Sequence, residues 1–206
     1  MIMYINSIEK YKGETYCVII NANKRVYLHR DIISQFGLEQ GSEIEHDKLT
    51  EVLYASDLRR ASRRAMYLIN ERDYSYIQLF EKLSKNYPED ICYEVANNMA
   101  KKGYINDRRY ADEIVYSYMI CKCYGPRRVK QELYKRGIKG QIADDAVEKA
   151  MDGLYDRLMS VVEKKYAGRL DDPDDFKEIA KVKNALVRMG YDFYDINAVI
   201  NDFFDE

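Results

Sequence analysis

One apolar helix face occurs three times in this 206-residue sequence. When three leucines are set in register, an apolar residue precedes each of them by four positions, giving the pairs Leu79 and Leu83, Val129 and Leu133, and Val182 and Leu186. Residues four apart lie on one face of an α-helix, so this spacing predicts three equivalent helices. The copies are roughly fifty residues apart, and a period of that length is typical of a tandem repeat.

Each copy is predicted to hold three helices. A longer apolar stripe with helical spacing precedes the shared face at 61–68, 111–118 and 154–161. A glycine follows the shared face at equal distance in two copies, as Gly137 and Gly190, and another helical stripe comes after it.

We therefore expect helical repeats at 47–104, 105–152 and 153–206. A three-helix unit of this size exposes too much apolar surface to be stable alone. Stacking of neighbouring units into an elongated, curved array is the expected remedy.

Residues 1–46 differ from the rest of the chain. Runs of β-branched and aromatic residues at 1–5, 15–20 and 25–28 are separated by turn-forming residues, and they predict a small β-meander. A short helix is expected at 29–36. The predicted fold class is therefore mainly α: three tandem three-helix repeats preceded by a small N-terminal β-rich segment.

The segment 124–140 contains the start and stop signals of one short helix. Pro126 suits the first helical position, and Gly137 stands where a helix commonly ends in a left-handed residue. Val129 and Leu133 share one face of this helix. The opposite arc carries Arg127, Arg128, Lys130 and Lys135.

Positive charge gathers in the first two repeats. The net charge is only -2, but 57–72 holds five arginines against two acids, 101–109 four basic residues against one acid, and 122–139 seven against one. In contrast, 171–206 holds ten acids against four bases. This division predicts a basic surface for a phosphate backbone or an acidic protein surface, although helices also carry many solvated cations. The contact candidates are Arg59, Arg60, Arg63, Arg64, Arg72, Lys101, Lys102, Arg108, Arg109, Arg127, Arg128, Lys130, Lys135 and Arg136.

The tyrosines allow two interpretations. Tyr104, Tyr110 and Tyr124 stand beside basic residues, as base-stacking aromatics do. Tyrosine rings also fill gaps between helices, and Tyr110 and Tyr118 stand at core-like spacing. The spacing favours packing.

Catalytic and cofactor motifs are absent from the sequence. There is no Gly-rich phosphate loop, no Ser–His or Cys–His arrangement and no metal-ligand spacing among the four cysteines and two histidines. We expect no enzyme activity, no cofactor and no metal. The sequence also lacks a signal-peptide pattern and a long apolar run, so we expect a cytoplasmic protein without membrane contact.

The segment 99–138 resembles the central signature of the RecX family of regulatory proteins. Its GYIND sequence at 103–107, the following Tyr110-Ala111, and the Tyr-Gly-Pro block at 124–126 with Glu132-Leu133 and Gly137-Ile138 match that signature. The resemblance extends over about 55–150 and more loosely over the third repeat. Residues 1–46 resemble the extension of some longer family members.

This resemblance implies a regulatory protein of DNA repair, homologous recombination and the SOS response. Such a protein binds the filament of RecA recombinase on single-stranded DNA and inhibits or modulates its ATPase, strand-exchange and coprotease activities. Tyr118-Met119-Ile120-Cys121 stands where family members often carry arginines, so RecA contact is expected more strongly than direct DNA contact. We expect a monomer. A stand-alone DNA-binding regulator with a helix-turn-helix around Gly137, and a helical scaffold for another protein, remain the alternatives.

Overall fold

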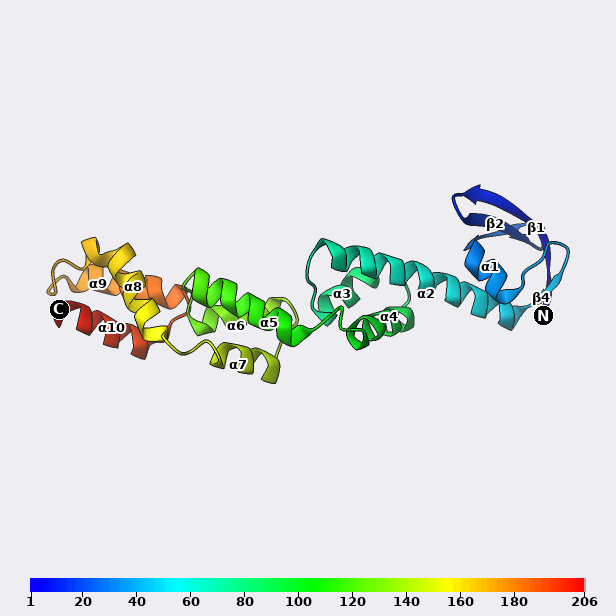
Figure 1. Cartoon of the computed structure of the whole chain (residues 1–206). Helices are drawn as coiled ribbons and strands as arrows, with labels where there is room; N and C mark the ends of the chain where they lie inside the picture. Colours follow the sequence, from blue (N-terminus) through cyan, green and yellow to red (C-terminus); the bar gives the residue numbers. More distant parts are fainter. Residues whose placement is uncertain (206) are drawn as a thin grey trace. The chain divides into compact units, whose positions relative to one another are not determined.

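The computed structural model describes residues 1–205, and its internal contacts separate two compact units (Figure 1). Unit 1 comprises Met1–Arg72 and Phe80–Lys102, and unit 2 comprises Asp73–Leu79 and the chain from Gly103 onward. The fold is mainly α-helical with a small N-terminal sheet, which confirms the predicted fold class. The predicted repeat boundaries and the shape of the array stay predictions. Within residues 1–205, no helix is both long and apolar enough to cross a membrane.

Unit 1 begins with a four-stranded antiparallel sheet in the order β3-β2-β1-β4. Its elements are β1 (Ile2–Lys12), β2 (Thr15–Ile20), β3 (Lys24–His29), α1 (Arg30–Phe36) and β4 (Glu43–Glu45). The expected strands at 15–20 and 25–28 and the short helix are confirmed, with His29 as the N-cap of α1.

The expected first strand, 1–5, was too short. β1 continues to Lys12, and it pairs with β2 through register irregularities between Ile5 and Ser7 and between Lys10 and Lys12. The second half of β1 is mostly polar and therefore resembles a loop in sequence. A strand is held by backbone hydrogen bonds to its neighbour, so this polar half extends the sheet without adding much to the core.

A buried apolar core joins the sheet to α1 and to the first part of α2 (His46–Glu71). Val18 and Leu28 come from the sheet, Ile32 from α1 and Val52 from α2, and none is more than 3% exposed. The sheet is thus stabilised by a helix that continues well beyond it, as expected for a small β unit.

The remainder of unit 1 is helical. α2 packs along α4 (Glu89–Lys101), and the half of α3 (Tyr76–Leu83) that begins at Phe80 also belongs to this unit. The Tyr54 hydroxyl donates a hydrogen bond to Glu94 Oε2 at 2.6 Å, joining α2 to α4. This hydrogen bond to a carboxylate raises the pKa of Tyr54 to about 12.

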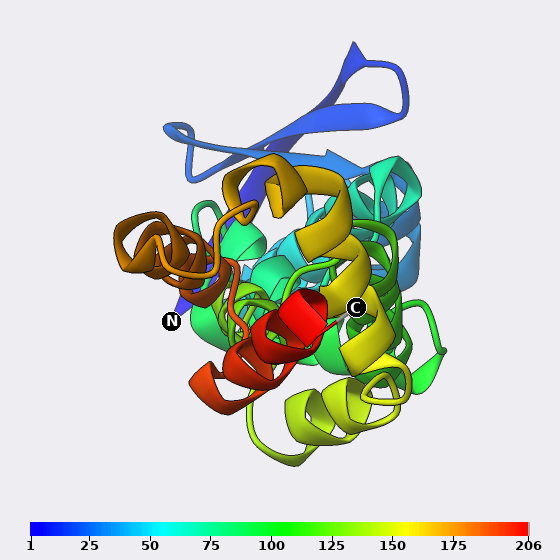
Figure 2. The same ribbon diagram turned by 90° about the vertical axis from the view of Figure 1, so that its left-hand side faces the viewer.

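Unit 2 contains two sets of three helices around one continuous core. The first set is α5 (Asp107–Val115) with its π-helical extension η1 (Tyr116–Cys121), α6 (Pro126–Lys135) and α7 (Gln141–Glu148). The second is α8 (Leu154–Tyr166) with the 3-10 turn η2 (Ala167–Arg169), α9 (Phe176–Arg188) and α10 (Phe193–Asp205). Figure 2 shows α10, in red, beside α8, which it contacts.

The predicted helix within 124–140 is confirmed as α6. Pro126 occupies its first position, and Gly137 follows it in the left-handed region, with φ 78°. Val129 and Leu133 are fully buried in the core of unit 2. Local sequence signals were sufficient here because both ends of the helix are set by single residues.

The backbone at the N-terminal end of α6 is in direct contact with the backbone of the turn that follows α9. The Gly125 N–H donates to the Met189 carbonyl oxygen at 2.9 Å, and the Arg127 N–H donates to the Gly190 carbonyl oxygen at 3.1 Å. A Cβ on Gly125 would lie 2.3 Å from the carbonyl carbon of Gly190, and one on Gly190 would lie 2.4 Å from the backbone nitrogen of Arg128. Only glycine at both positions permits this approach.

A corresponding contact joins residues 73–79 to the other end of α6. The Ser75 hydroxyl donates to the Arg136 carbonyl oxygen, and a Cβ on Gly137 would lie 2.7 Å from Ile77 Cβ. In the repeat register Ser75 corresponds to Gly125, and Gly137 corresponds to Gly190. The same junction therefore occurs twice in unit 2, with a serine in place of the glycine at one of the two sites.

Gly125→Ala should destabilise unit 2 by at least about 2 kcal/mol, because overpacking against rigid backbone forces the junction apart. The matched control is Gly168→Ala, since a Cβ at Gly168 meets nothing within 4 Å. That control should change the free energy of unfolding by less than about 0.5 kcal/mol. Urea unfolding followed by circular dichroism measures both variants, and equal unfolding midpoints would contradict this account of the junction.

Candidate protein and nucleic-acid interface

The fourteen predicted contact residues lie in both units. Unit 1 carries Arg59, Arg60, Arg63 and Arg64 on α2, Arg72 at its C-terminal end, and Lys101 and Lys102 at the end of α4. Unit 2 carries Arg108 and Arg109 in the first turn of α5, and Arg127, Arg128, Lys130, Lys135 and Arg136 on or directly after α6. The candidate cations therefore fall into two groups, one in each unit. How available each cation is to a partner depends on what its side chain already contacts.

Most cations of α6 have acidic partners within unit 2. Arg127 forms an ion pair with Asp192, and Lys130 Nζ lies 2.6 Å from Asp144 Oδ1. The sequence pattern gave no sign of the first pair, because its members are 65 residues apart. Exposed pairs of this kind contribute at most about 1 kcal/mol, so a more strongly charged partner could displace them.

The C-terminal turn of α6 holds a three-member charge network. Glu132 accepts hydrogen bonds from Lys135 Nζ at 2.8 Å and from Arg136 Nη1 at 2.9 Å. These two hydrogen bonds, the larger effect coming from Lys135, hold the pKa of Glu132 below its ordinary value. The guanidinium of Arg136 is only 21% exposed, so this cation serves the fold as well as the surface.

Two tyrosines and three cations form a stacked cluster beside α6, here called the tyrosine–cation cluster. Lys122 Nζ lies 4.1 Å and Arg136 Cζ 5.6 Å from the ring centroid of Tyr118, while Arg128 Cζ lies 4.2 Å from that of Tyr124. The two ring centroids are 5.9 Å apart. Lys122 is missing from the predicted contacts, since its contact with Tyr118 comes from the folding of η1, which its sequence did not predict.

The three tyrosines in this region pack against the core. Tyr110, Tyr118 and Tyr124 are partly buried against the apolar core of unit 2. This agrees with the packing interpretation for Tyr110 and Tyr118, whose spacing favoured it, whereas Tyr104 is 46% exposed. The cations over Tyr118 and Tyr124 add a cation–π attraction to that packing.

Several arginines of the other segments are also paired. Arg59 Nη2 lies 3.0 Å from Asp31 Oδ2, and Arg60 Nη1 lies 3.2 Å from Asp57 Oδ1. Arg64 stacks on Tyr67, with Cζ 5.2 Å from the ring centroid. On α5, Arg109 lies between two acids, with Nη2 3.6 Å from Asp73 Oδ1 and Nε 3.8 Å from Glu113 Oε1.

Four predicted contact residues have no internal partner of any kind within residues 1–205. Arg63, Lys101, Lys102 and Arg108 are exposed, and their side chains have no ion-pair, hydrogen-bond or ring partner within the described part of the chain, residues 1–205. Lys101 and Lys102 precede the GYIND segment, and Arg108 follows it directly. A charged partner can bind these four without breaking an internal contact.

The GYIND segment itself is structural. Gly103 has φ 75°, Ile105 is buried, and Asn106 caps α5 by accepting the Arg109 N–H at 3.0 Å. Asp107 Oδ1 accepts the Tyr76 N–H at 2.8 Å. Burial raises the pKa of the Asp107 carboxyl, although the hydrogen bond from Tyr76 opposes that effect. These residues shape the turn that carries the neighbouring cations.

No metal centre is formed within residues 1–205, where no three His, Cys, Asp or Glu side chains are grouped to hold an ion. Cys17, Cys92, Cys121 and Cys123 are free thiols. Burial raises the pKa of the Cys92 thiol, which keeps it in the unreactive protonated form.

Comparison with known sequences identifies similar proteins along most of the chain. Residues 106–147 match the profile of the second three-helix domain of RecX, and 152–200 match that of the third. A regulatory protein RecX from Clostridioides difficile is 28% identical over 207 residues, covering 98% of this chain and 97% of the relative. Another from Ectopseudomonas mendocina is 31% identical over 130 residues, covering 63% of this chain and 85% of the relative.

Solved structures share the fold. A crystal structure of a regulatory protein RecX superposes with a TM-score of 0.72 at 19% identity, covering 99% of this chain and 100% of the other. The structure of RecX from Lactobacillus salivarius gives a TM-score of 0.68 at 25% identity, covering 74% of this chain and 99% of the other.

Replacement of Glu132 by Gln should lower the stability of the folded state at pH 7 by about 1 kcal/mol, because the charged acceptor for Lys135 and Arg136 is lost. Since the pKa of Glu132 is lowered by folding, this stabilisation is present above the ordinary value of 4.5 and is lost as the pH falls through the lowered pKa. The difference between wild type and variant should therefore shrink in acid.

Urea unfolding at pH 7 and at about pH 3, at constant ionic strength, tests this pH dependence. Glu148→Gln is the matched control, since Glu148 is exposed and its side chain has no partner within residues 1–205. A stability difference for Glu132→Gln that is as large in acid as at pH 7 would show that its charge is not the cause.

Proposed function

The chain belongs to the RecX family, and from this premise we propose that it binds the RecA recombinase filament on single-stranded DNA. Binding inhibits the ATPase, strand-exchange and coprotease activities of the filament. The chain acts as a regulatory protein in this proposal, and no step of its action requires a catalytic group or a cofactor.

The unpaired lysines at the C-terminal end of α4 are the observation that carries this proposal. Lys101 and Lys102, in unit 1, are exposed and have no internal partner within residues 1–205, and Arg108, in unit 2, is likewise exposed and unpartnered there. The backbone of the two lysines is ordered before binding, because Lys101 ends α4 and the Lys102 N–H donates to the Asn98 carbonyl oxygen at 3.1 Å. Ordered, unpaired cations suit a fixed acidic surface, because less conformational entropy is lost when the partner binds.

The cations of α6 have a secondary role in the proposal. Arg127 and Lys130 must exchange an internal carboxylate for a partner group, so their net gain on binding is smaller. In a helix-turn-helix around Gly137 the recognition helix would be α7, which carries Asp144, Asp145 and Glu148 and no cation, so it is poorly suited to a DNA groove. The stand-alone DNA-binding alternative therefore receives less support than the RecA proposal.

The double variant Lys101→Glu and Lys102→Glu should weaken binding to RecA filaments at least tenfold, which corresponds to about 1.4 kcal/mol. Co-sedimentation with filaments on single-stranded DNA measures binding, and RecA-dependent ATP hydrolysis measures inhibition. Both should fall together, since one surface carries both effects in this proposal.

The matched control is Lys164→Glu with Lys165→Glu, which changes the same charge on two exposed lysines in the last turn of another helix, α8. This control should retain full inhibition. Equal inhibition by both double variants would refute the assignment of the α4 lysines. Tight, sequence-selective DNA binding without RecA, with a steep dependence on salt, would instead favour the DNA-binding alternative.

A further inference from the structure

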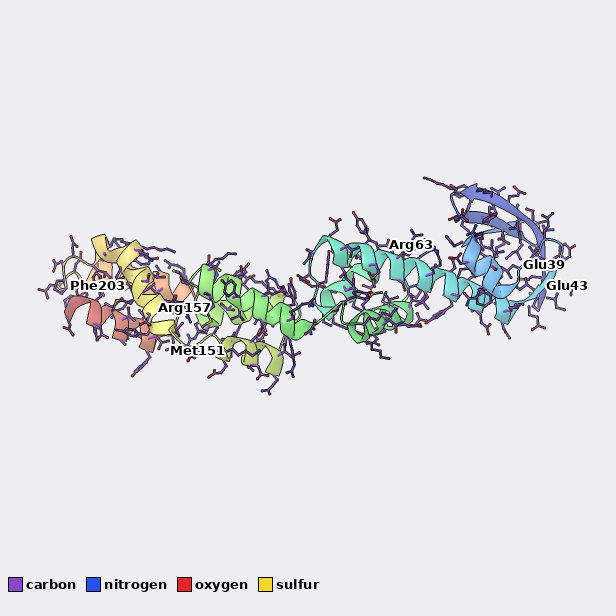
Figure 3. All side chains as sticks on the ribbon, viewed as in Figure 1. Glu39, Glu43, Arg63, Met151, Arg157 and Phe203 are labelled. Carbon is purple, nitrogen blue, oxygen red and sulfur yellow. The ribbon has the colours of Figure 1, made fainter. Side chains whose placement is uncertain are left out.

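A cleft of about 480 Å³ opens in unit 1 between the edge strand β3 and α2. One wall is formed by Arg59, Arg60 and Arg63, which lie within a little more than one turn of α2. Figure 3 shows Arg63 on the side of α2 from which the sheet rises. The volume falls in the range of small-molecule sites, about 300–1,000 Å³.

Charged groups of one sign line this cleft. Its three arginines are the charged side chains of the lining, whereas Asp31 and Asp57, which pair with Arg59 and Arg60, lie outside the lining. Arg63 has no partner within residues 1–205. The planar guanidinium groups donate in a fork that matches phosphate oxygens, so the cleft is suited to a phosphate group.

Arg59 is held in place by the start of α1. Its Nη2 lies 3.0 Å from His29 Nε2 and 3.0 Å from Asp31 Oδ2, and its side chain is only 27% exposed. Both contacts use the same nitrogen, which leaves Nη1 and Nε without a partner within the described residues. A guanidinium fixed in this way loses little freedom when it binds a ligand.

Hydroxyl groups and aromatic rings complete the lining. Thr15 and Ser56 add hydroxyls that can donate to an anion, and Tyr27 and Tyr87 add rings. Tyr27 is 47% exposed, and its ring centroid lies 4.8 Å from that of Tyr11. Exposed aromatic faces beside arginines are the combination that receives a nucleobase next to its phosphate.

We propose that this cleft binds a nucleoside phosphate, with the phosphate on Arg59, Arg60 and Arg63 and the base against Tyr27. The same chemistry is offered by a free nucleotide and by one nucleotide of a single strand of nucleic acid. The site does not involve Lys101, Lys102 or Arg108, and it needs no RecA. It is therefore independent of the function proposed above.

The experiment titrates the full-length protein, without RecA, with four probes: ATP, inorganic triphosphate, an oligothymidylate and an oligoglutamate peptide of similar charge. Isothermal calorimetry measures the affinities. ATP represents a free nucleotide, and the oligothymidylate represents a nucleotide within a single strand. Binding of either probe supports the site if Arg63→Glu weakens that binding. Displacement of ATP by the oligothymidylate assigns the cleft to a strand.

Arg63→Glu should weaken binding of the nucleotide probe at least tenfold. Arg64→Glu is the matched control, with the same charge change on the next residue of α2, outside the lining, and it should bind as the wild type does. Tyr27→Ala should weaken binding of ATP but leave binding of inorganic triphosphate unchanged, because only the base stacks. Both arginines are exposed, so circular dichroism should find all variants folded.

Three results would overturn the proposal. One is binding of oligoglutamate as tight as that of the nucleotide probes, which would make the cleft a site for an acidic peptide. Another is an equal effect of Arg63→Glu and Arg64→Glu, which would reduce the cleft to general surface charge. The third is the absence of binding by both ATP and oligothymidylate.

Discussion

A backbone contact that tolerates no side chain holds unit 2 together. Gly125 and Gly190 approach so closely that a methyl group on either would overlap main-chain atoms. Ser75 and Ile77 make the corresponding contacts with Arg136 and Gly137 at the opposite end of α6. Because α6 is clamped at both ends, its buried Val129 and Leu133 and its exposed cations keep fixed directions. The placement of every functional group on this helix depends on those two junctions.

The candidate cations fall into two classes according to their contacts. Around α6 and along α2, most cations are neutralised by acids of the same unit or stacked on tyrosine rings. A smaller set, Arg63, Lys101, Lys102 and Arg108, is left without such partners within residues 1–205. The cations paired with acids contribute little net field, whereas those stacked on tyrosine rings keep their charge but must give up that contact to bind a partner. Of the unpaired ones, Lys101 and Lys102 lie at the end of α4, Arg63 lies in the cleft beside β3, and Arg108 lies at the start of α5 in the other unit.

Much of the helical architecture could be predicted from the sequence because its signals are local. Pro126 and Gly137 set the ends of α6 through their own backbone preferences, and the four-residue spacing of Val129 and Leu133 marked the buried face. The polar half of β1 was missed, since its hydrogen bonds come from β2 and leave no apolar pattern. The π-helical extension η1 was missed as well, because its sequence does not differ from that of an ordinary amphipathic helix.

The candidate site was predictable only as a set of residue types. The sequence by itself determined the repeated apolar face, the division between basic and acidic segments and the fourteen candidate cations. Only the tertiary structure decided which of those cations are free, since the partner of Arg127 is Asp192, 65 residues away. It also brought Tyr27 and His29 from a strand to the arginines of α2, forming a cleft. Helix signals act over a few residues, whereas ion pairs and clefts depend on contacts between segments distant in the chain.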